Sequence, residues 1–157
     1  MALSKTDIKG AYPLPAYNYR VEIGGVAIGF SEVSGLSISH ETTTYKESPT
    51  SGGAPGPIVR NMPSQRAQPS ITLKKGLVKT QSIATLYKWI SSIQINQIEK
   101  KDIFVRLCDE KGEAVISWKV LNAFPKKLDA PSFSASSNDA AIESMELMGD
   151  AIQIEEV

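Results

Sequence analysis

The chain has 157 residues, of which 41% are hydrophobic and 22% charged, so it suits one globular domain with one core. Seventeen basic residues balance seventeen acidic ones, and the sequence therefore lacks the basic excess of a dedicated nucleic-acid-binding protein. The same neutrality removes the electrostatic repulsion that opposes self-association. We expect a single domain over residues 1–157 that does not bind nucleic acid by itself.

Cys108 is the only cysteine, so no disulfide can form within the chain, which fits assembly in a reducing cytoplasm. The first ten residues lack the apolar run of a signal peptide. No stretch of the sequence approaches the roughly 18 apolar residues of a membrane-spanning helix. We expect synthesis in the cytoplasm and no direct membrane insertion.

Residues 1–16 end in Tyr12-Pro13-Leu14-Pro15, and these prolines oppose a regular helix or a central strand, so an N-terminal arm is predicted. A strand is predicted over 17–23, followed by the turn Gly24-Gly25 and a second alternating run over 26–30, which together indicate a hairpin. The inward residues expected on the first strand are Tyr17, Tyr19, Val21 and Ile23.

Residues 31–46 are predicted to form a longer β segment whose two faces both become polar from Ser37 to Tyr45. Threonine favours strands through its stiff χ1 angle, but a strand with two wet faces gains little in an isolated monomer. We expect one face to line water while the strand edge pairs with another chain. The candidates for the water-lining face are Ser37, Ser39, Glu41 and Thr43.

Residues 47–69 hold five of the nine prolines and three glycines, which predicts an irregular connection. A connection of this length is uncommon in a compact domain and is usually functional or disordered. It also carries Ile58, Val59 and Met62, which a Gly/Ser linker would not need. Two interpretations stay open: a flexible surface loop, or a segment ordered by a neighbouring subunit.

A strand is predicted over 70–75 with Ile71 and Leu73 inward, followed by a helix over 82–93 with Ser82 as N-cap. Trp89 lies off the centre of the apolar stripe of this helix and is expected to pack under a loop. The stripe consists of Ile83, Leu86, Tyr87, Ile90 and Ile93.

A second hairpin is predicted over 102–108 and 113–124, with a loop over 125–138 and a last β region over 140–155. The apolar parity changes at Glu143-Ser144, which predicts a β-bulge there. About seven or eight strands then give a mainly β, antiparallel sandwich or flattened barrel with one flanking α-helix.

Enzymatic patterns do not appear in the sequence. His40 is the only histidine, and no Gly-x-Ser-x-Gly motif accompanies it. One histidine and one cysteine make no metal cluster, and the glycine pairs lack the Lys-Ser/Thr ending of a phosphate loop. We expect no enzyme, no catalytic residue, no cofactor and no metal.

An ordered set of segments resembles the phage tail-tube family, in the branch found in extracellular contractile injection systems. The set opens at Tyr12–Val21 and Phe30–Leu36, continues at Ile71–Gly76, and is strongest at Asn122–Pro125. It covers nearly the whole chain, but residues 48–69 are longer and richer in glycine and proline than the corresponding family segment.

The resemblance implies hexameric rings whose inner strands join into one continuous β-barrel around a lumen. Rings stack into a tube inside a contractile sheath, with baseplate, spike and cap proteins at its ends and effector cargo in the lumen. Contraction drives the tube through a target envelope. The particle is phage tail-like, either released from the cell or membrane-anchored. A tube-initiator paralogue, a tail-tube protein of a contractile phage and a secreted binding module remain alternatives.

The resemblance places contacts between subunits and between rings in the N-terminal arm and in the extended 47–69 connection, and it makes the water-lining candidates above lumen-facing. The candidate contact residues are Tyr12, Pro13, Tyr45, Lys46, Glu47, Ile58, Val59, Arg60, Met62 and Arg66.

Overall fold

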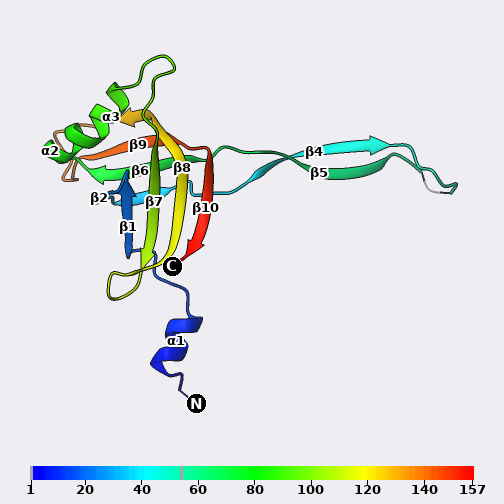
Figure 1. Ribbon diagram of the computed structural model, residues 1–157, viewed down its shortest axis with the longest axis horizontal. Helices are drawn as coiled ribbons and strands as arrows, with labels where there is room; N and C mark the ends of the chain where they lie inside the picture. The colour runs from blue at the N-terminus through cyan, green and yellow to red at the C-terminus, as the bar shows by residue number, and fades with distance from the viewer. Residues whose placement is uncertain (1, 54) are drawn as a thin grey trace.

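A computed structural model describes residues 2–53 and 55–157. These residues form a β-rich body with two projections, a short N-terminal arm and a long two-stranded hairpin that leaves the body in a different direction (Figure 1). The prediction of a mainly β, antiparallel fold with one helix flanking the body is confirmed.

The strands of the body form one antiparallel sheet in the order β2-β1-β7-β8-β9-β6-β3, with β10 also paired to β8. The sheet folds over itself because the long strand β8 serves both layers: its first part pairs with β7 and β10, and its last part with β9. The bounds are β1 Tyr19–Ile23, β2 Val26–Ile28, β3 Glu32–Ser34, β6 Ser70–Gly76, β7 Lys101–Cys108, β8 Ala114–Asp129, β9 Ile142–Met148 and β10 Ala151–Glu156.

Asn122 marks the point where β8 passes from one layer to the other. Its φ is 51°, a left-handed conformation that asparagine tolerates better than most residues. Its backbone N–H donates to Asp102 Oδ1 and its side-chain amide donates to Asp150 Oδ2, each at 3.0 Å. These bonds hold the bend in place, so that the two layers face each other across the core.

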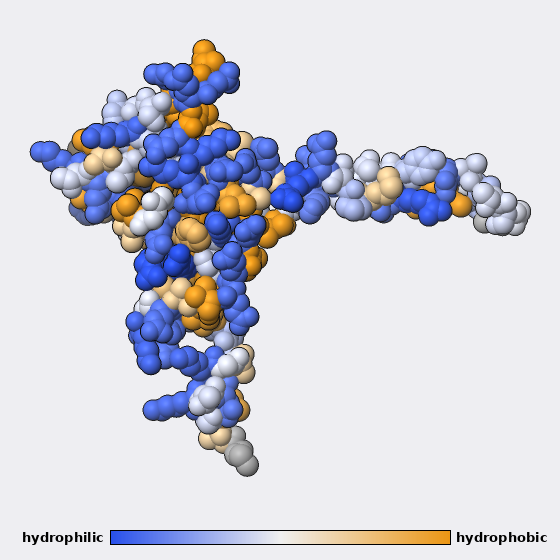
Figure 2. Space-filling model, in the orientation of Figure 1, coloured by the Kyte–Doolittle hydropathy of each residue, from blue (hydrophilic) through white to orange (hydrophobic). Residues whose placement is uncertain are grey.

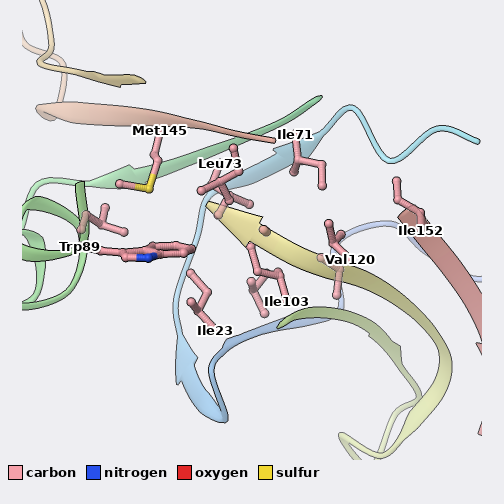
Figure 3. Packing of buried hydrophobic residues seen from close by; sticks show 13 residues of the cluster. Ile23, Ile71, Leu73, Trp89, Ile103, Val120, Met145 and Ile152 are labelled. Carbon is pink, nitrogen blue, oxygen red and sulfur yellow. The ribbon is translucent and has the colours of Figure 1, made fainter. Parts of the chain in front are cut away.

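The core fills the space between the two layers (Figure 3). Val21 and Ile23 from β1, as predicted, meet Ile71 and Leu73 from β6 there, all nearly inaccessible to solvent. Trp89 closes one end, and its indole N–H donates to the carbonyl of Glu99 at 2.8 Å. The remaining members of the cluster are Leu86, Ile103, Val105, Val120, Ala123, Met145, Leu147 and Ile152.

The flanking helical segment runs through α2 Lys79–Gln81, the π-helical η1 Ser82–Tyr87 and α3 Lys88–Ser91. The predicted stripe is partly wrong, because Ile83 and Tyr87 are 55% and 56% exposed. Leu86 of the stripe is buried as predicted, and Trp89, which was placed off the centre of the stripe, is buried as well. A π-turn bonds residue i to i+5, which rotates side chains away from the 3.6-residue register on which the prediction rested.

Ser82 lies inside this helical segment and does not cap it, so the predicted N-cap is also wrong. Its hydroxyl accepts a hydrogen bond from the backbone N–H of Val78 at 3.1 Å, and its side chain is buried.

The structure differs from the prediction at three further places: in the arm, at Tyr17 and at the end of β8. The arm contains a helix, α1 Lys5–Ala11, which ends before the prolines and begins with a capping box between Ser4 and Asp7. Tyr17 lies outside β1 and is 84% exposed, so it is not an inward residue. β8 continues through residues 125–129, which shortens the predicted 125–138 loop at its start.

The predicted bulge at Glu143-Ser144 is wrong. The β6–β9 register runs without interruption from Ser70–Met148 to Gly76–Ile142. Glu143 itself is buried on the same side as Met145, while Ile142 is exposed, so the apolar parity never changes. The 140–155 region is instead two strands separated at Gly149-Asp150.

The projecting hairpin consists of β4 His40–Glu47 and β5 Ile58–Arg66. Residues 58–66 were predicted to be irregular and are a strand; Pro63 within it pairs with Thr42 beside a register shift, where proline is tolerated. Within the described chain, β4 and β5 pair with each other and with no strand of the body.

Candidate assembly surfaces

The hairpin forms its own two-stranded sheet and projects away from the body (Figures 1 and 2). Every residue of β5 is exposed, and so is every residue of β4 except Glu47. An isolated two-stranded hairpin is at best marginally stable in water. Because β4 and β5 pair with no other described strand, the outer edge of each presents unpaired backbone groups, and both faces of the hairpin are open to solvent.

The hairpin's own side-chain bonds are few and exposed. Arg60 Nε lies 2.9 Å from Glu47 Oε1, and the Thr44 hydroxyl donates to Asn61 Oδ1 at 3.1 Å. An exposed ion pair contributes about 0–1 kcal/mol. These contacts set the register but do not by themselves explain an ordered projection of this length.

The register of β4 and β5 sorts the hairpin residues into two faces, because directly opposed residues lie on the same side of an antiparallel pair and sides alternate along each strand. We call them the tyrosine face and the threonine face. The tyrosine face consists of Thr43, Tyr45, Glu47, Ile58, Arg60 and Met62. The threonine face consists of Thr42, Thr44, Lys46, Val59, Asn61 and Pro63.

This sorting divides the sequence-predicted residues differently from expectation. Thr43, a candidate for the lumen, shares a face with Tyr45 and Glu47, which were candidates for subunit contacts. Lys46 and Val59, also candidates for subunit contacts, lie on the opposite face. Alternation along β4 alone places Tyr45 with Thr43, but the β5 residues that share each face could not be assigned from the sequence, because β5 was not predicted.

The remaining predicted residues lie at the root of the hairpin or elsewhere. Ser37 and Ser39 precede β4, and the Ser39 carbonyl accepts from the backbone N–H of Ala67 at 2.9 Å. Arg66 ends β5 at the same root. Tyr12 and Pro13 belong to the arm and follow α1, far along the chain from the hairpin.

A surface ion pair connects the arm to the body. Lys9 Nζ lies 2.8 Å from Glu110 Oε1 in the β7–β8 turn. This hydrogen bond lowers the pKa of the Glu110 carboxyl and raises the pKa of the Lys9 amine. No residue of α1 is buried, and Tyr12 beyond its end is exposed. Sequence reasoning missed α1, although Ser4 and Asp7 are spaced as a cap.

The body carries an apolar cavity of about 420 Å³, lined in part by Val33, Leu36, Val105 and Trp118. Glu32 is the ionisable carboxylate on its wall, and no histidine or cysteine lines it. Within residues 2–53 and 55–157, no group of three or more His, Cys, Asp or Glu side chains is placed to hold a metal ion. The same residues include no helix that is long and apolar enough to span a membrane.

The family model described as T4-like virus tail tube protein gp19 matches residues 15–153. The chain belongs to this tail tube family. It is a structural tube protein and not an enzyme, and its similarity to tube proteins of contractile injection systems extends over its full length. A comparison with curated proteins gave no significant match.

Solved tail tube structures agree with this assignment. A chain of the sheath–tube complex of an extracellular contractile injection system (PVC, extended state) is 39% identical with a TM-score of 0.87, over 99% of this chain and 100% of that one. A chain of the anti-feeding prophage tube-terminating cap is 40% identical with a TM-score of 0.83, over 100% of both. A chain of the anti-feeding prophage baseplate is 18% identical with a TM-score of 0.75, over 94% and 98%, which shows the fold alone.

Proposed function

We propose that this chain is the repeating subunit of the inner tube of a contractile injection system. Six copies form a ring, rings stack into a hollow tube within a sheath, and effectors travel in the lumen when contraction drives the tube through a target envelope. The observation that carries the proposal is the end-to-end similarity to a chain of a sheath–tube complex, at 39% identity over 99% of this chain.

The exposed hairpin supports assembly from many copies. Its strands have free edges and open faces, which a neighbouring copy can pair and cover. A head-to-tail contact along the tube axis does not close on itself, so stacking continues. Several modest contacts engaged together by each added copy give high avidity.

The same similarities favour the repeating subunit over an initiator at the baseplate end. Chains from the sheath–tube and cap complexes are 39% and 40% identical to this chain, whereas the baseplate chain is 18% identical. Sheath, cap, baseplate and spike proteins are then the partners. Assembly takes place in the cytoplasm, consistent with a single buried cysteine, before the particle is released or anchored.

Electron microscopy of the purified full-length chain tests this function. We expect long hollow tubes whose end-on views have six-fold symmetry, and native mass spectrometry of partly dissociated tubes should give hexamers. Rings that do not stack would indicate an initiator. A protein that stays monomeric at high concentration, or rings of another symmetry, would overturn the proposal.

A further inference from the structure

The hairpin continues the wall formed by β3 and β6. β3 pairs with β6 up to Ser34–Thr72, the Ala67 N–H to Ser39 carbonyl bond follows, and β4 then pairs with β5 from His40–Arg66 outward. One long antiparallel ribbon thus runs from the body into open solvent. The projecting part of this ribbon has two open faces, one on each side of the β4–β5 pair.

The two faces of the hairpin differ in apolar content. The tyrosine face exposes three large apolar side chains, Tyr45, Ile58 and Met62, at 50%, 39% and 43%, whereas the threonine face exposes one, Val59, at 51%. Burying apolar surface is favourable, so the tyrosine face gains more from a covering neighbour. The threonine face offers hydroxyl and amide groups from Thr42, Thr44 and Asn61, and water satisfies such groups at no desolvation cost.

The charged residues of the two faces also favour covering the tyrosine face and leaving the threonine face in water. On the tyrosine face, Arg60 and Glu47 are already paired at 2.9 Å, so the pair can enter an interface with its charges compensated. On the threonine face, Lys46 takes part in no ion pair with another described residue. Covering an unpaired ammonium is costly, which keeps this face in water.

We propose that the tyrosine face of the hairpin lies on a neighbouring copy of this chain and that the threonine face lines the lumen. The inference rests on the proposed tube function and deepens it. The occupant is a second copy, because the hairpin has two free strand edges and extends a wall that the body itself cannot close. The lumen wall then presents Thr42, Thr44 and Asn61 together with Lys46, Val59 and Pro63, in place of the expected Thr43.

Neighbouring positions provide matched variants for the test. Tyr45→Asp and Met62→Asp place a carboxylate on the tyrosine face, and Thr44→Asp and Asn61→Asp place the same group one residue away on the threonine face. All four sites are exposed in the isolated chain, so circular dichroism should show folded protein in each case. We expect the first two variants to reduce the fraction pelleted as tubes at least tenfold, and the second two to form tubes with the wild-type ring spacing.

The outcomes separate the two proposals. Absence of wild-type tubes would refute the tube function itself. With wild-type tubes present, assembly blocked only by the threonine-face variants, by all four variants, or by none would overturn the face assignment and leave the tube function standing.

Thiol labelling of assembled tubes gives a second readout. Thr44→Cys and Thr43→Cys add a thiol to each face, and the unaltered chain serves as the blank because Cys108 is buried. With a small maleimide that enters through the tube ends, we expect the thiol of Thr44→Cys to react at least tenfold faster than that of Thr43→Cys. Equal rates, or the reverse order, would contradict the assignment.

Discussion

Gly35 lies where the β3–β6 pairing gives way to the projecting ribbon. Its φ is 87°, and an added Cβ would overlap the carbonyl oxygen of Ser70. Gly35→Ala should therefore combine left-handed strain with a backbone clash and destabilise the monomer by at least about 2 kcal/mol. Urea unfolding followed by tryptophan fluorescence measures this.

Gly25→Ala is the matched control for this prediction. Gly25 has a nearly equal φ of 86°, but an added Cβ there meets no atom within 4 Å. The control should cost only the strain, about 1 kcal/mol. Equal losses in the two variants would show that the contact with Ser70 does not matter.

The two glycines also show what the sequence can predict at the residue scale. Gly25 was assigned to a hairpin turn because its flanking strands alternate over a few neighbouring residues. Glycine is needed at position 35 because the backbone of Ser70, 35 residues further along the chain, lies against it. The residues around Gly35 do not predict this long-range contact. Glu143 is similar: its burial opposite Lys75 contradicts its polarity and became visible only with the β6–β9 register.

At the scale of elements, the sequence predicted those strands that bury one face. Val21, Ile71 and Ile103 follow strict alternation because one side of each strand packs into the core. β5 has both sides in solvent, so its alternation carries no hydrophobic signal, and Pro63 further argued against a strand. The helical stripe was misplaced for a different reason: η1 is π-helical, and the residue types of this segment do not indicate whether its hydrogen bonds follow the α or the π pattern.

The α1 tether should depend on pH. The pKa of Glu110 lies below its ordinary 4.5 and that of Lys9 above its ordinary 10.5, because the ammonium donates to the carboxylate. The contact is therefore complete at neutral pH. It is lost as pH falls through the lowered pKa of Glu110, and again as pH rises through the raised pKa of Lys9. Amide hydrogen exchange of residues 5–11 should accelerate relative to the intrinsic rate in both ranges.

Two variants separate the tether from the helix cap. The pKa of Asp7 is also lowered, by its hydrogen bonds with Ser4, so the cap weakens in the same acidic range. Asp7→Asn should leave the alkaline transition intact, whereas Glu110→Gln should remove it. An alkaline transition that persists in Glu110→Gln would contradict the tether.

At the scale of the whole molecule, the sequence predicted the body, an N-terminal arm and a polar β segment that includes most of β4, but it predicted neither the hairpin nor the helix of the arm. The body is stabilised by its own core, so its pattern is complete within one chain. α1 and β5 contain no buried residue, so neither element has a hydrophobic face from which the sequence could predict it. Which residues of β5 share a face with those of β4 depends on the pairing of the two strands, which a local pattern does not show.

The body and the hairpin should consequently be separable. Residues 41–65 can be replaced by Asn-Gly between His40 and Arg66, which are partners in the β4–β5 register. None of the replaced residues belongs to the core cluster, and shortening the loop changes closure entropy only modestly. We expect the free energy of unfolding of the monomer to change by less than about 2 kcal/mol, while tubes disappear from electron micrographs.

Urea denaturation of the variant and of the wild type, both at concentrations where the wild type is monomeric, measures the first effect. A variant that no longer folds would mean that the hairpin stabilises the monomer through contacts beyond its own two strands. A variant that still forms tubes would mean that the ring closes through the body alone. Retained folding with lost assembly requires that the free edges and open faces of β4 and β5 are satisfied by another copy, because the deletion then removes nothing that one chain needs for itself.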